Sequence, residues 1–350
     1  MRKLWIIVRF AGHWLGPLLI VAAAFFFIFP PTLFIDPSAS VAIAGAIVTG
    51  IACLFMRAPE WRRRRTVLAT VALIALVFGG WHAWDARRGY REEIVSLDNR
   101  GAHLVGTLYL PDRPGSVPGI VLVHGSGPAR RLLSHGYAAY FVRRGYAVLS
   151  YDKRGVGEST GQYGGGLREV CPDNVDLLAS DASAALSLLA KRPQVQAGAV
   201  GFAGISQAGW IIPRAAVLNG NAAFMLLLAG PTNSAQSIER LRRFRRDVPD
   251  GYTADQAYAL AQTKAVDFPC ADFDPMPDLR TLDIPGLWLL GEQDWIIPFG
   301  PTSRNLEILR DLGKPYRYRK IPGANHGLAG QNELIGDTID RWLAQVTVNR

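Results

Sequence analysis

Three long stretches of this 350-residue chain lack Asp, Glu, Lys and Arg altogether: residues 10–35, 37–56 and 66–84. Each stretch is long enough to cross a hydrocarbon core of about 30 Å as a helix rising about 1.5 Å per residue. A single cleaved signal peptide does not account for three successive apolar stretches. Helices of a soluble core rarely lack charge over such lengths. We therefore expect a transmembrane domain over residues 1–90, with three helices at about 12–35, 38–56 and 66–84.

Acidic residues are scarce in the same region. Up to residue 91 there are 11 Lys and Arg against 3 Asp and Glu, whereas the remaining chain carries 27 against 26. The pI near 9.7 therefore comes from the N-terminal quarter and does not indicate nucleic-acid binding. Basic residues precede the first expected helix and form the run 62–65 before the third. By the positive-inside rule, both basic segments face the cytoplasm, and everything after the third helix lies outside it.

Cysteine is also rare, with three residues in the whole chain. No Cys and His cluster has the spacing of a zinc site, and no glycine-rich loop has the spacing of a nucleotide site. We therefore expect neither a metal nor a cofactor. Cys53 lies in the second expected membrane helix. Cys171 and Cys270 lie downstream, where an oxidising compartment would let them pair; two unpaired thiols are the alternative.

From about residue 91 to the end, strand-like and helix-like segments alternate, which predicts an α/β domain with a mostly parallel sheet flanked by helices. The expected strands are 93–97, 103–110, 119–123, 147–151, 199–203, 223–228, 287–290 and 316–321, and the expected helices are 132–143, 174–190, 207–218, 305–312 and 332–346. The alternation stops at about 231–283, where we expect a helical lid. Its charged run 239–247 is either a solvated helix face or a surface for anionic head groups or an acidic substrate.

Ser206 is the candidate nucleophile. It lies in the run 204–209, Gly-Ile-Ser-Gln-Ala-Gly, directly after an apolar strand and before a helix. A sharp turn between a strand and a helix exposes a serine hydroxyl at the edge of a sheet. Small residues are needed there because the strand and helix pack closely. Ala208 takes the place where glycine is usual.

A serine hydroxyl needs a base and an acid that orients the base. His326 and Asp294 each follow a predicted strand, and the order Ser, Asp, His is that of α/β hydrolases. Both candidates therefore fall at the sheet edge where open α/β sheets bind ligands. Glu292 is the nearest competitor of Asp294, followed by two acidic residues of the insertion, Asp274 and Asp278.

A tetrahedral intermediate also needs hydrogen-bond donors for its oxyanion. The backbone N–H of Gln207 is one candidate donor, and the N–H of Gly125 or Ser126 is the other. His124 is expected to brace this loop rather than to act in catalysis. In the glycine-containing segment 151–159 we expect a buried Asp–Arg brace for the active-site floor.

Taken in order, these motifs resemble the α/β-hydrolase superfamily, in particular a bacterial branch of dienelactone-hydrolase, serine-aminopeptidase and acyl-thioesterase type. The motifs are His-Gly-Ser-Gly-Pro at 124, Tyr-Asp-Lys-Arg-Gly-x-Gly-x-Ser at 151, Gly-x-Ser-Gln-Ala-Gly-Trp at 204 and Gly-x-x-Asp at 291. The resemblance covers about 92–344 and implies an α/β-hydrolase fold over 91–350. It also implies acyl transfer through Ser206, His326 and Asp294.

The leading hypothesis is a membrane-anchored serine hydrolase that cleaves carboxylic esters through an acyl-enzyme. Its expected partners are a small ester or acyl substrate and the lipid bilayer, without nucleic acid. In a bacterium the catalytic domain would lie on the periplasmic side of the inner membrane. The alternatives are a lipid acyltransferase or thioesterase, a non-catalytic binding protein, and an aminopeptidase-like serine peptidase. The peptidase would need an acidic anchor such as Asp272, Asp274 or Asp278.

Overall fold

The computed structural model describes residues 89–347, which contain a single sheet of eight strands. The strand order is β1-β2-β4-β3-β5-β6-β7-β8. Strands β1 and β2 are antiparallel to their neighbours, and every pair from β4 through β8 is parallel. The strands are β1 (Tyr90–Asn99), β2 (Ala102–Pro111), β3 (Val117–Val123), β4 (Ala147–Tyr151), β5 (Val195–Ile205), β6 (Met225–Leu228), β7 (Gly286–Gly291) and β8 (Tyr316–Ile321).

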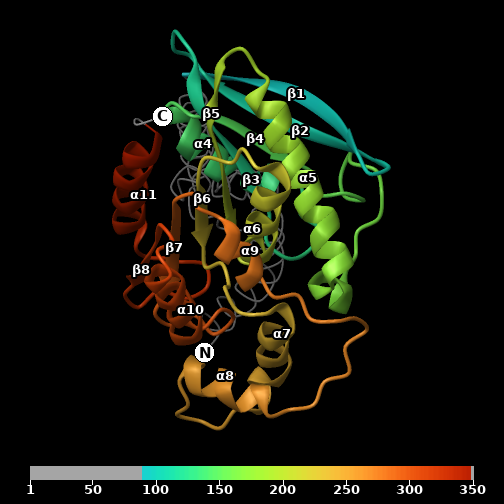
Figure 1. Cartoon of the computed structure of the whole chain (residues 1–350), viewed down its shortest axis with the longest axis vertical. Helices are drawn as coiled ribbons and strands as arrows, with labels where there is room; N and C mark the ends of the chain where they lie inside the picture. Colours follow the sequence, from blue (N-terminus) through green and yellow to red (C-terminus); the bar gives the residue numbers. More distant parts are fainter. Residues whose placement is uncertain (1–88, 348–350) are drawn as a thin grey trace, which may run out of the picture. The chain divides into compact units, whose positions relative to one another are not determined.

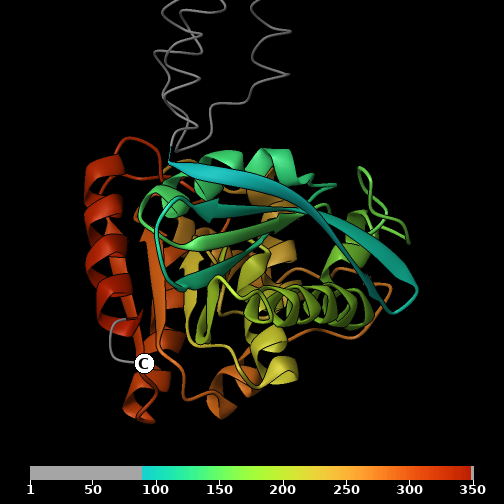
Figure 2. The same cartoon turned by 90° about the horizontal axis from the view of Figure 1, so that it is seen from above.

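Helices cover both faces of this sheet (Figures 1 and 2). On one face, α4 (His135–Arg143) lies beside α11 (Asn332–Thr347), and the Tyr140 hydroxyl of α4 donates to Asp340 of α11 at 2.9 Å. On the other face, α5 (Pro172–Ala190) lies beside α6 (Ala208–Asn219), where Arg214 pairs with Asp176 at 2.8 Å. The fold therefore has three layers with the sheet in the middle.

The central strands are buried on both faces, which explains their uninterrupted apolar sequences. All residues of β4, β6 and β7 are buried. By contrast, β1 lies at the edge of the sheet and alternates between exposed and half-buried residues. The expected strands and helices of the α/β domain are all present, with ends that differ by a few residues. The expected helix at 305–312 differs most, because α10 (Phe299–Asp311) begins at 299 rather than 305. The expected helix at 132 begins as the 3-10 helix η2 (Arg131–Ser134) before α4.

The insertion after β6 carries α7 (Ala235–Phe244), η4 (Arg245–Asp247), α8 (Ala254–Gln262) and α9 (Met276–Thr281). Figure 1 shows α7 and α8 beyond one end of the sheet. A capping box starts α8, because the Thr253 side chain accepts from the Gln256 backbone N–H and the Gln256 side chain accepts from Thr253 N–H. A disulfide between Cys171 and Cys270 ties the insertion to the start of α5.

The expected membrane helices fall within residues 1–88, outside the described residues. Within 89–347, none of the helices combines the length and the apolar character needed to cross a bilayer.

Candidate active site

Ser206 occupies the turn between β5 and α6. Its φ is +56°, in the left-handed region that a serine rarely adopts. The turn is held by the Ser206 N–H, which donates to the Leu228 carbonyl at 3.0 Å. Gly204 is needed beside it, because a Cβ there would lie 2.5 Å from the Ala208 Cβ and 2.6 Å from the Val123 carbonyl oxygen. A strained residue held by its surroundings in this way is typical of a functional turn.

Asp294 and His326 come together at the same edge of the sheet, after β7 and β8. The His326 Nδ1 and the Asp294 Oδ2 are 2.8 Å apart. Asp294 is buried, and its other carboxylate oxygen accepts from the backbone N–H groups of Ile296 and Ile297 at 2.8 and 2.9 Å. Three hydrogen bonds therefore fix the carboxylate that orients the imidazole.

The described contacts include no hydrogen bond between the Ser206 hydroxyl and the His326 ring. Such bonds are often long in ligand-free enzymes and shorten when the substrate binds. The structure thus assembles the acid and base of the expected triad directly, with Ser206 on the same sheet edge.

The predicted oxyanion loop packs directly against the nucleophile turn. A Cβ built at Gly125 would lie 3.4 Å from the Ser206 Cβ and 3.3 Å from the Ile205 carbonyl oxygen. Among the described contacts, the backbone N–H groups of Gly125, Ser126 and Gln207 donate to no protein acceptor. These are the three N–H groups that the sequence indicates for the oxyanion, and they remain available to a ligand.

A buried lysine joins the two sides of this oxyanion site. The Lys153 ammonium donates to the carbonyls of Gly125 at 2.6 Å and Gly127 at 3.2 Å, and to the side-chain oxygen of Gln207 at 2.9 Å. The Gln207 amide in turn donates to the Glu169 carbonyl at 3.0 Å, and the Glu169 carboxylate accepts from Gly127 N–H at 3.1 Å. We refer to these five residues as the oxyanion ring. Burial lowers the pKa of Lys153 to about 8.

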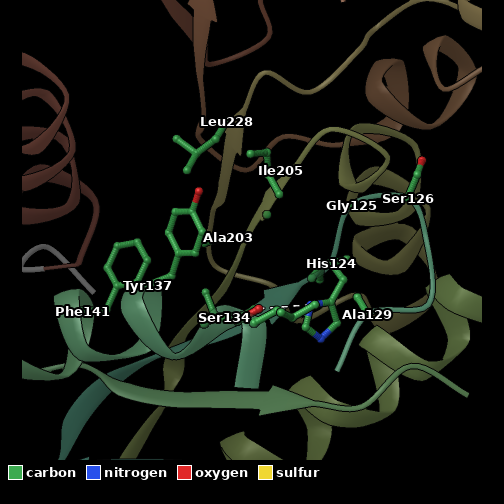
Figure 3. A pocket seen from close by; sticks show the side chains of 14 residues that line it. His124, Gly125, Ser126, Ala129, Ser134, Tyr137, Phe141, Ala203, Ile205 and Leu228 are labelled. Atoms are coloured by element: carbon green, nitrogen blue, oxygen red, sulfur yellow. Dashed lines mark hydrogen bonds between the residues drawn. The ribbon is translucent and has the colours of Figure 1, made fainter. Parts of the chain in front are cut away.

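His124 braces the same loop, as the sequence predicts. Its Nε2 lies 2.6 Å from the Tyr151 carbonyl oxygen, and its Nδ1 lies 3.1 Å from the Ser134 hydroxyl (Figure 3). Burial lowers the pKa of His124 to about 4, so the ring is neutral at pH 7. The neutral ring donates to Tyr151 and accepts from Ser134, which leaves neither nitrogen for proton transfer to a substrate.

The expected Asp–Arg brace of segment 151–159 is present as two pairs. The side chains of Asp152 and Arg154 are both buried; Asp152 pairs with Arg131, and Arg154 pairs with Asp181 at 2.6 Å. Arg154 thereby anchors the segment to α5, whereas Asp152 anchors it to η2.

The acidic competitors of Asp294 have other partners. Glu292 is exposed and binds Lys320 at 2.9 Å. Asp278 pairs with Arg214 at 3.3 Å, Asp272 accepts from Gln236 N–H at 2.9 Å, and Asp274 accepts from Met276 N–H at 3.0 Å. None of these four carboxylates forms a hydrogen bond or ion pair with His326 in residues 89–347. Nor does any group of three His, Cys, Asp or Glu in that range have an arrangement that could hold a metal ion.

Parts of the chain are similar to known proteins. Residues 98–265 match the model of the X-Pro dipeptidyl-peptidase (S15) family. The chain is 38% identical over 68 residues to the quorum-quenching protein AidA of Acinetobacter baumannii, and 31% identical over 117 residues to the thiohydrolase aneE of Aspergillus aculeatus. These matches cover 19% and 33% of this chain, but only 22% and 34% of the two relatives.

Among solved structures, the esterase Pf2001 of Pyrococcus furiosus has a TM-score of 0.57 at 15% identity. The match covers 75% of this chain and 93% of the esterase. At such low identity this likeness shows the fold alone. Taken together, these comparisons show an α/β-hydrolase fold and a likeness of residues 98–265 to the S15 peptidase family.

Proposed function

We propose that the protein is a carboxylic-ester hydrolase that acts through Ser206, His326 and Asp294. The observation that carries the proposal is the left-handed turn at Ser206, on the same sheet edge as the Asp294–His326 pair. A serine in that turn has its hydroxyl exposed at the edge where the base is already oriented.

The proposed reaction has two acyl-transfer steps. As the Ser206 oxygen bonds to the ester carbonyl carbon, His326 takes the serine proton, and Asp294 stabilises the resulting imidazolium. The backbone N–H groups of Gln207 and Gly125 or Ser126 stabilise the oxyanion. The bond to the alcohol then breaks, and His326 returns the proton to the alcohol oxygen. Water repeats the sequence on the acyl-enzyme, which releases the acid and restores Ser206.

An ester fits the described residues better than a peptide with a free amino terminus. An aminopeptidase needs a carboxylate that is free to bind the ammonium group of its substrate. The three candidate anchors in the insertion, Asp272, Asp274 and Asp278, are each engaged within the domain. A thioester remains the second candidate substrate, because one relative is named a thiohydrolase and the same acyl-enzyme chemistry serves both.

We also propose that residues 1–90 anchor the enzyme in a bacterial inner membrane, with the catalytic domain in the periplasm. The three charge-free stretches and the basic residues around them support this proposal. The disulfide between Cys171 and Cys270 also supports it, because disulfides persist in oxidising compartments.

The test compares purified wild-type protein with Ser206→Ala on p-nitrophenyl acetate, the matching thioester and alanine p-nitroanilide. We expect the wild type to favour the oxygen ester over the anilide, and Ser206→Ala to lose turnover while keeping its unfolding transition. Ser96→Ala, at an exposed serine of β1, is the matched control and should retain full activity. Ester hydrolysis that persists in Ser206→Ala would contradict the proposal.

A further inference from the structure

A cavity of about 220 Å³ lies between α4 and the sheet, directly beside the nucleophile turn. Figure 3 shows Tyr137 and Phe141 of α4 on one side of it, and the oxyanion loop with His124 and Gly125 on the other. The aliphatic part of its wall comes from strand ends and η2: Leu122, Leu133, Ala203, Ile205 and Leu228.

The strand register explains why these apolar side chains form one wall. Leu122 of β3 pairs with Ala203 of β5, and Ile205 pairs with Leu228 of β6. Partners in register lie on the same face of a sheet, as do alternate residues of one strand. These four side chains therefore share the face that α4 covers. The last of them along β5, Ile205, immediately precedes Ser206, so the cavity ends beside the nucleophile turn, although Ser206 itself does not line it.

The cavity lies on the oxyanion side of the site rather than on the histidine side. Gly125 and Ser126 line it, whereas His326 and Asp294 do not. During ester cleavage the histidine delivers a proton to the departing alcohol oxygen, so the alcohol must lie toward His326. The group that extends the other way from the carbonyl carbon is the acyl group.

We propose that this cavity binds the acyl group of the substrate and restricts it to a short, uncharged, apolar group. The inference rests on the proposed ester hydrolysis and adds the class of acyl group that the site accepts. An engineered apolar cavity of about 150 Å³ holds benzene, so a cavity of this size has room for a phenyl group or a short branched chain.

The chemistry of the wall excludes charged acyl groups. Among the described residues that line the cavity there is no Asp, Glu, Lys or Arg. Both nitrogens of His124 already have partners, Tyr151 and Ser134. A charged group such as an aminoacyl or succinyl chain would lose its water here without gaining a partner, which is costly.

Two substitutions on the cavity wall should change the acyl preference in opposite directions. Leu228→Ala enlarges the cavity, and Ala203→Val narrows it. For each protein, kcat/KM is measured on p-nitrophenyl acetate, hexanoate, benzoate and the singly charged succinate ester. We expect Leu228→Ala to raise the ratio of hexanoate to acetate about tenfold and Ala203→Val to lower it about tenfold, since one methylene in an apolar pocket is worth roughly 10- to 200-fold. Wild type should process succinate poorly relative to hexanoate.

Leu227→Ala is the matched control. Leu227 is the neighbour of Leu228 on β6, is fully buried and belongs to the core on the opposite face. Replacing this leucine by alanine should leave the hexanoate-to-acetate ratio of kcat/KM unchanged. Equal ratios in wild type, Leu228→Ala and Ala203→Val, with acetate still hydrolysed, would overturn the acyl assignment alone. No turnover of any ester by wild type would overturn the proposed function and this inference with it. If Leu228→Ala does not fold, the hexanoate-to-acetate ratio of Ala203→Val alone tests the acyl assignment.

Discussion

Lys153 is the residue that connects the two sources of oxyanion donors. Its three ammonium hydrogens match its three acceptors, the carbonyls of Gly125 and Gly127 and the side chain of Gln207. It touches no group that reacts, so its contribution is to hold the N–H groups of Gln207 and the loop in place. Positioning of this kind raises the rate of the chemical step more than it raises substrate affinity.

We predict that Lys153→Met lowers kcat by roughly 10- to 100-fold with little change in KM. This loss is smaller than the roughly 100- to 1,000-fold cost of removing an oxyanion donor itself. Burial holds the pKa of Lys153 near 8, so the ammonium loses a proton as the pH rises through that value. The neutral amine then has two hydrogens for three acceptors.

Wild-type kcat should therefore fall above pH 8, and Lys153→Met should lack this decline. The measurement is kcat and KM from pH 6 to pH 9.5 on p-nitrophenyl acetate, corrected for hydrolysis without enzyme. A Lys153→Met variant with wild-type kcat and the same pH profile would show that the oxyanion ring does not depend on the lysine.

For single residues, the sequence indicates the proposed reacting groups better than the residues that hold them in place. Ser206, Asp294 and His326 each follow a strand, and strand ends meet at one edge, so their place at the same sheet edge follows from local patterns. The partners of Lys153 are backbone carbonyls and an amide on other loops, which no spacing in the sequence reveals. The same reason explains why the sequence does not reveal the partners of Asp152 and Arg154, since Arg131 and Asp181 are more than 20 residues away along the chain.

Among the elements, the insertion after β6 is cross-linked to the rest of the domain by one disulfide. The disulfide between Cys171 and Cys270 links residues 99 positions apart and joins the insertion to the start of α5. Cys171 is two residues from Glu169, a member of the oxyanion ring. The disulfide therefore lies close in sequence to both the insertion and the oxyanion ring.

Replacing both cysteines by serine should lower the free energy of unfolding by about 4–5 kcal/mol, as the chain-entropy model gives for a loop of this length. The measurement is urea unfolding of the double variant against oxidised wild type, with reduced wild type as the control for the serine substitutions. Equal unfolding midpoints for all three proteins would contradict the prediction.

The elements themselves are largely predictable because the apolar segments have the right length and period. The central strands are short apolar runs, and the ends of β4 and β8 agree with the prediction. For the insertion, the sequence predicts only a helical lid, without defined helices. Its short helices α8 and α9, with 9 and 6 residues, are too brief for a clear period.

For the molecule as a whole, the charge distribution is the clearest guide to its place in the cell. Almost all the net positive charge lies in the N-terminal quarter, around the three charge-free stretches. The rest of the chain is close to neutral, and it has the α/β-hydrolase fold and the Asp294–His326 pair on which the proposed hydrolysis depends. We therefore propose an enzyme whose active serine is reached from the periplasm.

The measurement that tests this account most directly is labelling with a fluorophosphonate that does not cross the inner membrane. Intact cells and lysates that contain wild type or Ser206→Ala are compared, and the labelled residue is identified by mass spectrometry. We predict labelling of wild type at Ser206 in intact cells and none in the variant. Labelling only after lysis would support an activated Ser206 but would place it on the cytoplasmic side of the membrane. Absence of labelling in both samples, with the protein folded, would contradict the claim that Ser206 is an activated nucleophile.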